Sequence, residues 1–321
     1  MRQLTAVAAL AGAALLAGAP AAYAQSYPTK PITIVVPFGP GSGSDLVSRI
    51  YAKHIMAETG GTAVVENRPG ANAMIGAQFV AKAAPDGHTV LMGSGTANAT
   101  NYALYAGRIA YRPEAFATVS VIFVTPPVIF AAPGIGGDTV RKAVAAAKAS
   151  ARGASCGTGN AVTLVACEML KRLTGTDIVA VSYKGNAQSL TDLAGGQITL
   201  AISDMGAAAP FVSSGRIRPV AIAARDRLAS LPNVPSAKEQ DIDMDFLSWN
   251  AVFVPAGTPE PIIRTLNAAA RRMLASEEWE KQRQTSAGAK VSGELEFSRK
   301  FVQEEIAKWD RYVRETGVKV E

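Results

Sequence analysis

The chain has 321 residues and a formal net charge of +6, with 29 Gly, 18 Pro, two Cys and two His. Its 32 Lys and Arg residues are scattered rather than gathered into a dense basic run with interleaved aromatic residues, which argues for solvated helix faces and against a nucleic-acid partner. After the first 24 residues, no apolar run reaches the roughly 18 residues that a membrane-spanning helix needs.

The first 24 residues have the organisation of a secretory signal peptide. Arg2 precedes an apolar core rich in alanine and leucine, Pro20 ends that core, and Ala22-Tyr23-Ala24 supplies a small-x-small cleavage site before Gln25. We therefore expect export and a mature chain of 297 residues with a formal charge of +5, because Arg2 is removed. That length exceeds what one hydrophobic core usually supports, so two domains are expected.

The mature chain opens with an apolar, β-branched run over residues 32–36, which predicts a buried strand. A loop rich in glycine and serine follows, and then a helical pattern from Leu46, with Asp45 or Ser44 as the expected N-cap. Such a junction aims unpaired N–H groups and the positive end of the helix dipole at one spot, so it can bind an anion without a charged side chain. A tight turn without a ligand is the alternative interpretation. Neither G-x-x-x-x-G-K-[ST] nor G-x-G-x-x-G is present, so a nucleotide is not the favoured anion.

The following segments continue an alternation of strands and helices. The pattern predicts two further strands, over 62–67 and 89–92, with a helix over 74–83 between them. Ile75, Phe79 and Val80 are expected on the inner face of that helix. The third strand ends, like the first, in a small polar loop, residues 93–98. Because ligands of parallel sheets lie beyond the carboxyl ends of the strands, the loops after the first and third strands are expected to face one crevice.

A long apolar run over 119–132 is interrupted by Pro126-Pro127, which suits a connection that leaves one sheet and enters another. The first domain crossing is placed there. The second domain repeats the rhythm, with helices over 138–150, 162–173, 187–193 and from 206 to about 213, strands over 178–182, 198–202 and 219–223, and a glycine turn over 156–160. A return strand over 249–259 makes a second crossing and a two-strand hinge.

Three helices are predicted after the return strand, over 259–275, 278–285 and 295–316. In the last of them, Phe297, Phe301, Ile306 and Trp309 are spaced as an apolar stripe, which indicates core packing rather than a cofactor site.

The cysteines and histidines do not indicate a metal site. Cys156 lies in a loop and Cys167 about two turns into a helix; a disulfide and two free thiols both stay open, and two isolated thiols are too few for a soft-metal cluster. His54 and His88 are interpreted as surface residues.

A serine hydrolase is a competing function, because Ser42 and Ser94 both lie in glycine-flanked turns. Neither matches G-x-S-x-G, and a base would have to be His54, two to three turns into the first helix, or His88, at the opposite end of a strand. We therefore expect no catalytic residues, no cofactor and no enzyme activity.

Several short motifs occur in an order that is characteristic of one family. They are Tyr27-Pro28-Thr29-Lys30-Pro31-Ile32, Val36-Pro37-Phe38 with Pro40-Gly41 and Asp45, Val65-Glu66-Asn67-Arg68-Pro69-Gly70-Ala71, Ala84-Pro85-Asp86-Gly87, Tyr183-Lys184-Gly185, Asp192-Leu193 with Gly195-Gly196-Gln197, and Pro255-Ala256-Gly257-Thr258-Pro259. Each motif alone is weak, but the order and spacing are specific. Over essentially the whole mature sequence, the chain resembles the Bug (TctC-type) family of extracytoplasmic solute receptors, which are associated with tripartite tricarboxylate transporters.

The resemblance implies an α/β fold of the periplasmic-binding-protein type II, in which two doubly wound α/β domains are joined by two crossover strands and close over a small carboxylate. The lobes would comprise residues 25–124 plus 252–321, and residues 125–251. Carried over from the family, backbone groups and waters in the loops after the first and third strands would hold one carboxylate, and the second lobe would set specificity. The implied ligand-binding residues are Phe38, Pro40, Gly41, Ser42, Asp45, Ser94, Thr96 and Asn98 in the first lobe, and Thr158, Gly159, Asn160, Thr163, Tyr183, Lys184 and Asp204 in the second.

One departure from the family concerns the second lobe. Many members have a Gln-His pair after the glycine turn, where this chain has Ala161-Val162-Thr163-Leu164-Val165; a more apolar wall would suit an aromatic or branched carboxylate. Asp204 is either a partner for an amine or amide on the ligand or a helix cap, and Lys184 is either a carboxylate partner or a solvated lysine.

The function expected from the resemblance is a monomeric periplasmic receptor with a single inter-domain site of micromolar or tighter affinity. It would serve a membrane transporter of the tripartite tricarboxylate type. A receptor that reports to a sensor protein is the alternative, because a protein that closes about a hinge presents a new surface when loaded.

Overall fold

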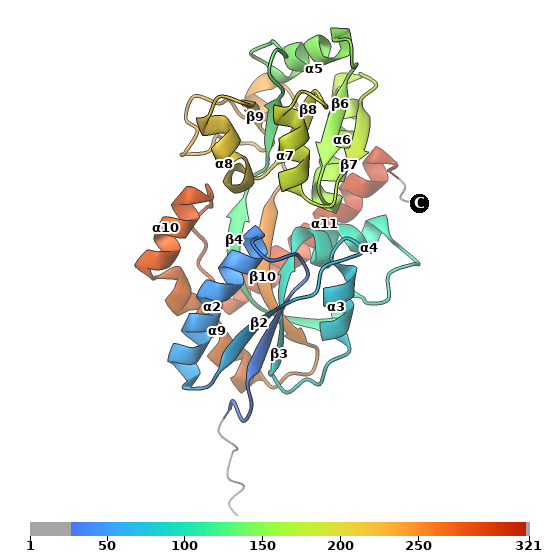
Figure 1. Cartoon of the computed structure of the whole chain (residues 1–321). Helices are drawn as coiled ribbons and strands as arrows, with labels where there is room; N and C mark the ends of the chain where they lie inside the picture. Colours follow the sequence, from blue (N-terminus) through green and yellow to red (C-terminus); the bar gives the residue numbers. More distant parts are fainter. Residues whose placement is uncertain (1–26, 319–321) are drawn as a thin grey trace, which may run out of the picture.

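Ten strands form two separate five-stranded sheets in residues 27–318, the part of the chain that the structure describes. The structure is a computed structural model, in which the second sheet lies above the first and β4 and β10 lead from one to the other (Figure 1). The predicted signal peptide, residues 1–24, lies outside the described residues.

The first sheet has the order β2-β1-β3-β10-β4. Its strands are β1 (Ile32–Val36), β2 (Ala63–Asn67), β3 (Thr89–Ser94), β4 (Phe116–Thr125) and β10 (Ser248–Pro255). The strands β1, β2 and β3 are parallel, whereas β10 runs antiparallel to both β3 and β4. This sheet and its helices, α2 (Gly43–Thr59), α3 (Met74–Ala81), α4 (Asn101–Leu104), α9 (Glu260–Leu274), α10 (Glu277–Thr285) and α11 (Leu295–Thr316), are called the first lobe.

The second sheet has the order β7-β6-β8-β5-β9. Its strands are β5 (Val128–Ala131), β6 (Ser155–Thr158), β7 (Val179–Ser182), β8 (Leu200–Ser203) and β9 (Arg218–Ile222). The strands β6, β7 and β8 are parallel, and β5 is antiparallel to β8 and β9. With α5 (Val140–Ala149), α6 (Ala161–Thr174), α7 (Asn186–Ala194) and α8 (Met205–Ser213), it forms the second lobe.

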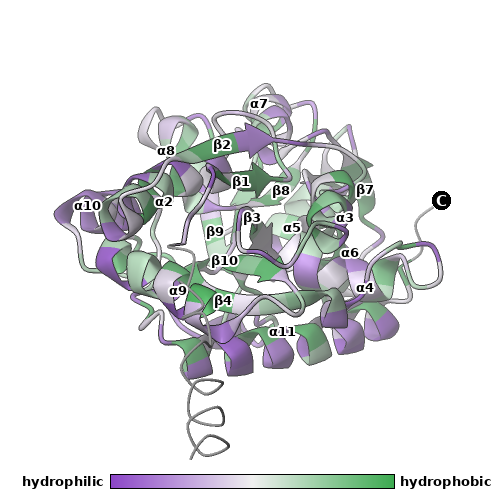
Figure 2. Ribbon diagram, turned by 90° about the horizontal axis from the view of Figure 1, so that it is seen from below, coloured by the Kyte–Doolittle hydropathy of each residue, from purple (hydrophilic) through white to green (hydrophobic). Residues whose placement is uncertain are grey.

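The run of β-branched residues in β1 forms a strand because both faces of the first sheet are covered. Ile32, Ile34 and Val36 point into the core beneath α2 and α9, while Val35 points into the core on the opposite face. Alternating side chains that are all apolar satisfy both layers. In Figure 2 the strands of this sheet lie between helices whose hydrophilic residues face outward. The predicted α/β fold with two sheets is confirmed.

The chain passes between the two sheets twice. The chain leaves β4, passes Pro126-Pro127 and enters β5 at once, and residues 223–247 return it to β10. Because β4 and β10 pair along their length, the two connections run side by side. The C-terminal helix α11 also touches both lobes, through an ion pair of 3.1 Å between Glu315 Oε2 and Arg172 Nη1 of α6.

Two predicted apolar faces were wrong in part, since Val80 and Trp309 are buried and Phe301 and Ile306 pack against the core, but three of the predicted residues are exposed. In α3, Ile75 and Phe79 are 52% and 40% exposed, because small residues let the helix approach Pro37, and a Cβ on Gly76 would lie 3.0 Å from that residue. Phe79 instead lies under the Arg68 guanidinium, whose Cζ is 3.7 Å from the ring centre. In α11, Phe297 is 41% exposed; the residues that are buried on this helix are Ser298, Val302, Glu305, Trp309, Tyr312 and Val313.

The interpretation of His88 as a surface residue was also wrong. Its side chain is buried in the turn before β3, where Nε2 accepts a hydrogen bond of 3.1 Å from the Thr29 N–H and the ring packs edge-on against Tyr27. These partners lie about 60 residues earlier in the chain, so the local sequence gave no sign of them.

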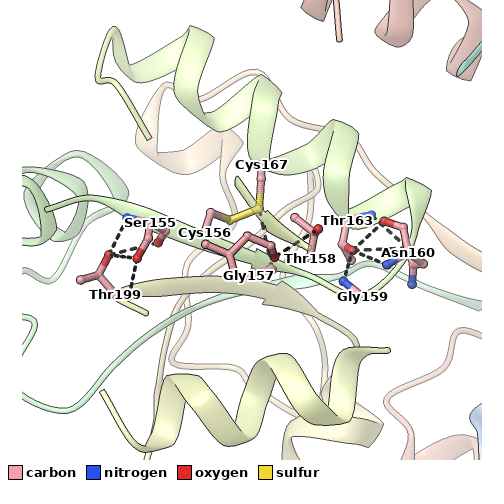
Figure 3. Close-up of a disulfide and its surroundings, with 10 residues drawn as sticks. Ser155, Cys156, Gly157, Thr158, Gly159, Asn160, Thr163, Cys167 and Thr199 are labelled. Carbon is pink, nitrogen blue, oxygen red and sulfur yellow. Dashed lines mark hydrogen bonds between the residues drawn. A yellow bond between two sulfur atoms is a disulfide. The ribbon is translucent and has the colours of Figure 1, made fainter. Parts of the chain in front are cut away.

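The two cysteines form a disulfide between β6 and α6, with Cα atoms 6.1 Å apart (Figure 3). The bridge closes a short loop around the second lobe's glycine turn, and both residues are buried. We expect replacement of both cysteines by alanine to lower the free energy of unfolding by about 2–3 kcal/mol, because the unfolded chain regains the entropy of that loop. Urea unfolding measures this loss, with reductant added to the variant as the control; equal midpoints for the variant and the oxidised wild type would contradict it.

Candidate functional site

The turn between β1 and α2 is built by Gly41 and Ser42. Gly41 has a φ of +79°, which favours glycine, and Ser42 is the N-cap of α2, its Oγ accepting a hydrogen bond of 3.3 Å from the Asp45 N–H. The prediction of Ser44 or Asp45 as the cap was therefore wrong by two or three residues. The helix begins at Gly43, and the N–H groups of its first turn have no acceptor within the helix.

Asp45 lies one turn inside α2 and is the most connected side chain of this region. Only 2% of it is exposed, and its carboxylate accepts hydrogen bonds from the Gly41 N–H (3.0 Å), Asn67 Nδ2 (3.0 Å) and the Arg49 guanidinium (3.0 and 3.1 Å). Burial raises the pKa of Asp45, but these bonds together outweigh it, and the net pKa lies below the ordinary range. The ionised Asp45 side chain thus connects the loop after β1, through Gly41, to the end of β2, through Asn67.

The pKa of Asp45 predicts how acid affects stability. Because the folded-state pKa is lowered, the stabilisation is fully present above the ordinary Asp pKa of about 3.9 and is lost as the pH falls through the lower folded value. We expect the difference in unfolding free energy between wild type and Asp45→Asn to shrink as the pH is lowered below about 4. Urea unfolding at a series of acidic pH values measures it; a difference that does not depend on pH would contradict this assignment.

Asn250 joins this turn to the end of β3. Its Nδ2 donates to Ser44 Oγ at 2.8 Å and to the Gly93 carbonyl at 3.1 Å, and the side chain is buried. The parallel pairing of β1 with β3 puts the two loops at the same edge of the sheet. The loops after the first and third strands therefore lie together.

The loop after β3 winds into a π-helical turn, Thr96–Thr100. Ser94 Oγ accepts from the Ala97 N–H at 3.2 Å, and Asn98 Oδ1 accepts from the Ser94 N–H at 3.3 Å. The Asn98 amide nitrogen is buried without a partner among the described residues. Such turns often occur at functional sites.

In the second lobe, the glycine turn after β6 is stabilised by a capping box (Figure 3). Asn160 Oδ1 accepts from the Thr163 N–H at 3.0 Å, and Thr163 Oγ1 accepts from the N–H groups of Asn160 and Gly159 at 3.2 and 3.0 Å. These polar groups, which the resemblance implied as ligand contacts, are thus used within the protein. A Cβ on Gly159 would lie 2.2 Å from the backbone nitrogen of Asn186, so this turn packs directly on the start of α7.

The ends of β7 and β8 carry the remaining polar residues of the second lobe. The Tyr183 hydroxyl donates to Asp192 Oδ2 at 2.9 Å, and burial together with this carboxylate raises the pKa of Tyr183 to about 12. Lys184 is exposed. Asn186 Nδ2 donates to Asp204 Oδ2 at 3.3 Å, and Asp204 is the N-cap residue of α8 although its side chain makes no capping hydrogen bond.

The start of β10 connects the two lobes' polar groups. The Ser248 hydroxyl lies close enough to Asp204 to lower the pKa of that carboxyl, and Asn250 holds Ser44 on the first lobe. Residues two apart in a strand point to the same face, and no irregularity separates Ser248 from Asn250. Ser248, beside Asp204, and Asn250, which holds the N-terminus of α2, therefore lie on one face of β10, with their Cα atoms about 7 Å apart along the strand.

The implied ligand-binding residues differ in accessibility. The exposed ones are Pro40, Gly41 and Lys184, and the partly buried ones are Ser42, Asn160, Tyr183 and Asp204. The buried ones are Asp45, Ser94, Thr96, Asn98, Thr158 and Thr163. Phe38 and Gly159 are half-buried.

The sequence interpretation missed Asn67, Asn186 and Asn250; a lone amide inside the apolar strand around Asn250 was a usable signal. Two surface hollows, of about 210 and 580 Å³, lie away from these residues, beside 132–135 and beside Arg271 and Arg272.

The region after the glycine turn, where an apolar wall was expected, is mostly core. Ala161, Val162 and Val165 are buried, and only Leu164 is partly exposed. Among the described residues, no three His, Cys, Asp or Glu side chains are placed to hold a metal ion. None of the described helices is both long and apolar enough for a membrane span.

Two α/β lobes joined by paired crossing strands, with helix N-termini and polar loops brought to the junction, define the class of solute-binding receptors. The model of the tripartite tricarboxylate transporter family receptors (TctC) matches residues 47–318, and the chain belongs to this family. It is 32% identical over 302 residues to protein BugT of Bordetella pertussis, which covers 92% of each chain.

Solved structures of the same kind resemble this one closely. An R. palustris protein with adipate has a TM-score of 0.84 at 30% identity, over 91% of this chain and 99% of that one. MatC from Rhodopseudomonas palustris with bound malate has a TM-score of 0.81 at 28% identity, over 89% of this chain and all (100%) of that one.

Proposed function

We propose that this protein is a periplasmic receptor that captures a small carboxylate between its two lobes for a tripartite tricarboxylate-type transporter. The single observation that carries the proposal is the arrangement along β10, where Asn250 holds the N-terminus of α2 and Ser248 approaches the N-terminus of α8. Helix N-termini attract anions through their free N–H groups and dipoles. Malate and adipate occupy the two R. palustris structures, and carboxylates are therefore the ligand class to test first.

Within this proposal, the first lobe holds the carboxylate and the second reads the rest of the ligand. Gly41 donates to Asp45, so the ligand would use the N–H groups of the first turn of α2, at Gly43 and Ser44. The ionised Asp45 orients this turn and is not itself a carboxylate contact. We also propose a monomeric receptor whose two domains comprise residues 25–124 plus 252–321 and residues 125–251, so that the domain boundaries fall within the crossing strands β4 and β10.

The same positions support a receptor without catalytic activity. Ser42 Oγ accepts from Asp45, and Ser94 Oγ accepts from Ala97. His88 precedes β3 while Ser94 ends it, so this imidazole lies at the other end of the strand from that hydroxyl. Steady turnover of an ester or amide by the purified protein would contradict this part of the proposal.

A thermal-shift screen of small carboxylates tests the function. A ligand at about 100 times its dissociation constant should add about 2.7 kcal/mol to the unfolding free energy, because it binds the folded state alone. We expect a subset of carboxylates to raise the melting temperature, with matched alcohols and sugars as the negative controls. A shift with sugars or metal ions but with none of the carboxylates would overturn the assignment.

A further inference from the structure

Three carboxyl groups with raised or lowered pKa lie in buried surroundings near the lobe junction, and they differ in how their charge is balanced. Asp45 is bound by Arg49. Glu305, on α11, is bound by Lys308 and also accepts from Trp249 Nε1 at 3.0 Å and Trp309 Nε1 at 3.1 Å. Within residues 27–318, Asp204 forms no ion pair, and its Oδ1 is buried without any hydrogen-bond partner. Buried charges in folded proteins are normally paired, so Asp204 lacks the group that the other two possess.

The surroundings of Asp204 favour a role of its carboxyl group as a hydrogen-bond acceptor. Its Oδ2 accepts a hydrogen bond from Asn186 Nδ2 and the Ser248 hydroxyl also interacts with this carboxyl, but Oδ1 keeps unused acceptor capacity. Burial raises the pKa of Asp204, while Ser248 and Asn186 lower it in part. As the N-cap residue of the nine-residue helix α8, Asp204 also lies at a dipole end that favours negative charge.

Three more buried polar atoms of the second lobe have no hydrogen-bond partner among the described residues. They are Asn186 Oδ1 and Ser189 Oγ of α7, and Ser203 Oγ at the end of β8, on the residue before Asp204. A concentration of unpaired polar atoms is rare in folded proteins and calls for an unseen partner. Ser248, which interacts with the Asp204 carboxyl, and Asn250, which holds Ser44 of α2, share one face of β10, and their Cα atoms are about 7 Å apart along the strand.

We propose that Asp204 determines specificity by accepting a hydrogen bond from a second polar group of the ligand, so that the receptor prefers carboxylates that also carry an ammonium, amide or hydroxyl donor and disfavours those whose second group is an ionised carboxylate. This inference rests on the proposed function, because it assumes that the first lobe holds a carboxylate. A donor on the ligand would satisfy Oδ1, whereas a second carboxylate has no proton to donate to it. An unpaired buried acceptor is costly, so the discrimination should be large.

The test uses four ligands of one chain length that share a carboxylate: 5-aminopentanoate, glutaramate, glutarate and pentanoate. Their second groups are an ammonium, an amide, a carboxylate and a methyl group. Calorimetric titration of the wild-type protein at neutral pH should give an affinity at least about tenfold tighter for the two donor-bearing ligands than for glutarate or pentanoate. This comparison needs no variant and is therefore independent of any folding defect.

The isosteric variant Asp204→Asn should reduce the preference for 5-aminopentanoate over glutarate by at least about tenfold, because one acceptor oxygen is replaced by a donor group while the shape is kept. Asp177→Asn is the matched control in the same lobe, since the side chain of Asp177 is 86% exposed, and its selectivity should equal that of the wild type. Binding of the four carboxylates without donor preference, or an Asp204→Asn variant with wild-type selectivity, would overturn this inference and leave the proposed function standing. Absence of binding by these four together with the whole carboxylate screen would overturn both.

Discussion

Replacement of Asp45 by alanine is expected to weaken carboxylate binding by more than about tenfold and to lower the free energy of unfolding by about 2–4 kcal/mol. The carboxylate accepts four hydrogen bonds, two of them from Arg49, and it holds the loop after β1 against Asn67. Without it, Gly41 and Asn67 lose their common acceptor, and the first turn of α2 loses its fixed position. Calorimetry with the best carboxylate of the screen and urea unfolding measure the two effects.

Asp86→Ala is the matched control for this prediction. Asp86 lies in the same lobe, accepts from Lys30 at 2.9 Å and from the His88 N–H at 3.0 Å, and also has a lowered pKa. It precedes β3 rather than following it, at the opposite edge of the sheet from Asp45. We expect Asp86→Ala to lose some stability and to keep its ligand affinity. Equal losses of affinity in the two variants would show that Asp45 acts only through general stability.

Replacement of Gly159 by alanine is expected to have the largest effect in the second lobe. The added Cβ would lie 2.2 Å from the Asn186 nitrogen and 2.5 Å from the Gly185 carbonyl carbon, and because backbone atoms cannot yield as a flexible side chain does, α7 has to shift. We expect a loss of about 1–3 kcal/mol in stability and a fall of at least about tenfold in ligand affinity, since Asn186 moves relative to Asp204.

Gly185→Ala is the matched control in the adjoining loop. Gly185 has a φ of 177°, which any residue adopts, and a Cβ there would meet nothing within 4 Å. This variant should therefore keep wild-type stability and affinity, as measured by the same unfolding and calorimetric titrations. Wild-type behaviour of Gly159→Ala would mean that the contact between the two loops does not position the site.

Much of the architecture was predictable because its signals are local. The β-branched run of β1 and the double proline between β4 and β5 each report the conformation of their own segment. The alternation of strands with helices gave two α/β sheets, and the ordered motifs indicated the family. The polar loops at the strand ends followed from the same pattern, because parallel strands end at one edge of a sheet.

The errors arose where a residue's surroundings come from elsewhere in the chain. The N-cap of α2 shifted to Ser42 because Gly41 adopts a positive φ that starts the helix earlier. Phe79 turned outward because Gly76 makes the close contact of α3, and Phe297 lies outside the face of α11 that carries Ser298, Val302 and Trp309. A period of apolar residues shows that a helix has a buried face, but it does not show which of several overlapping faces a neighbouring layer will cover.

By itself the sequence determined the succession of strands, helices and turns and the family to which the chain belongs, because backbone preferences and short motifs act within a few residues. Only the tertiary structure decided how the polar groups of the first lobe meet those of the second lobe. Asn250 binds Ser44, 206 positions earlier, and Asp204 lies beside Ser248 without a cationic partner. Such pairings depend on which strands become neighbours, and that is settled by burial of the two cores rather than by any local pattern.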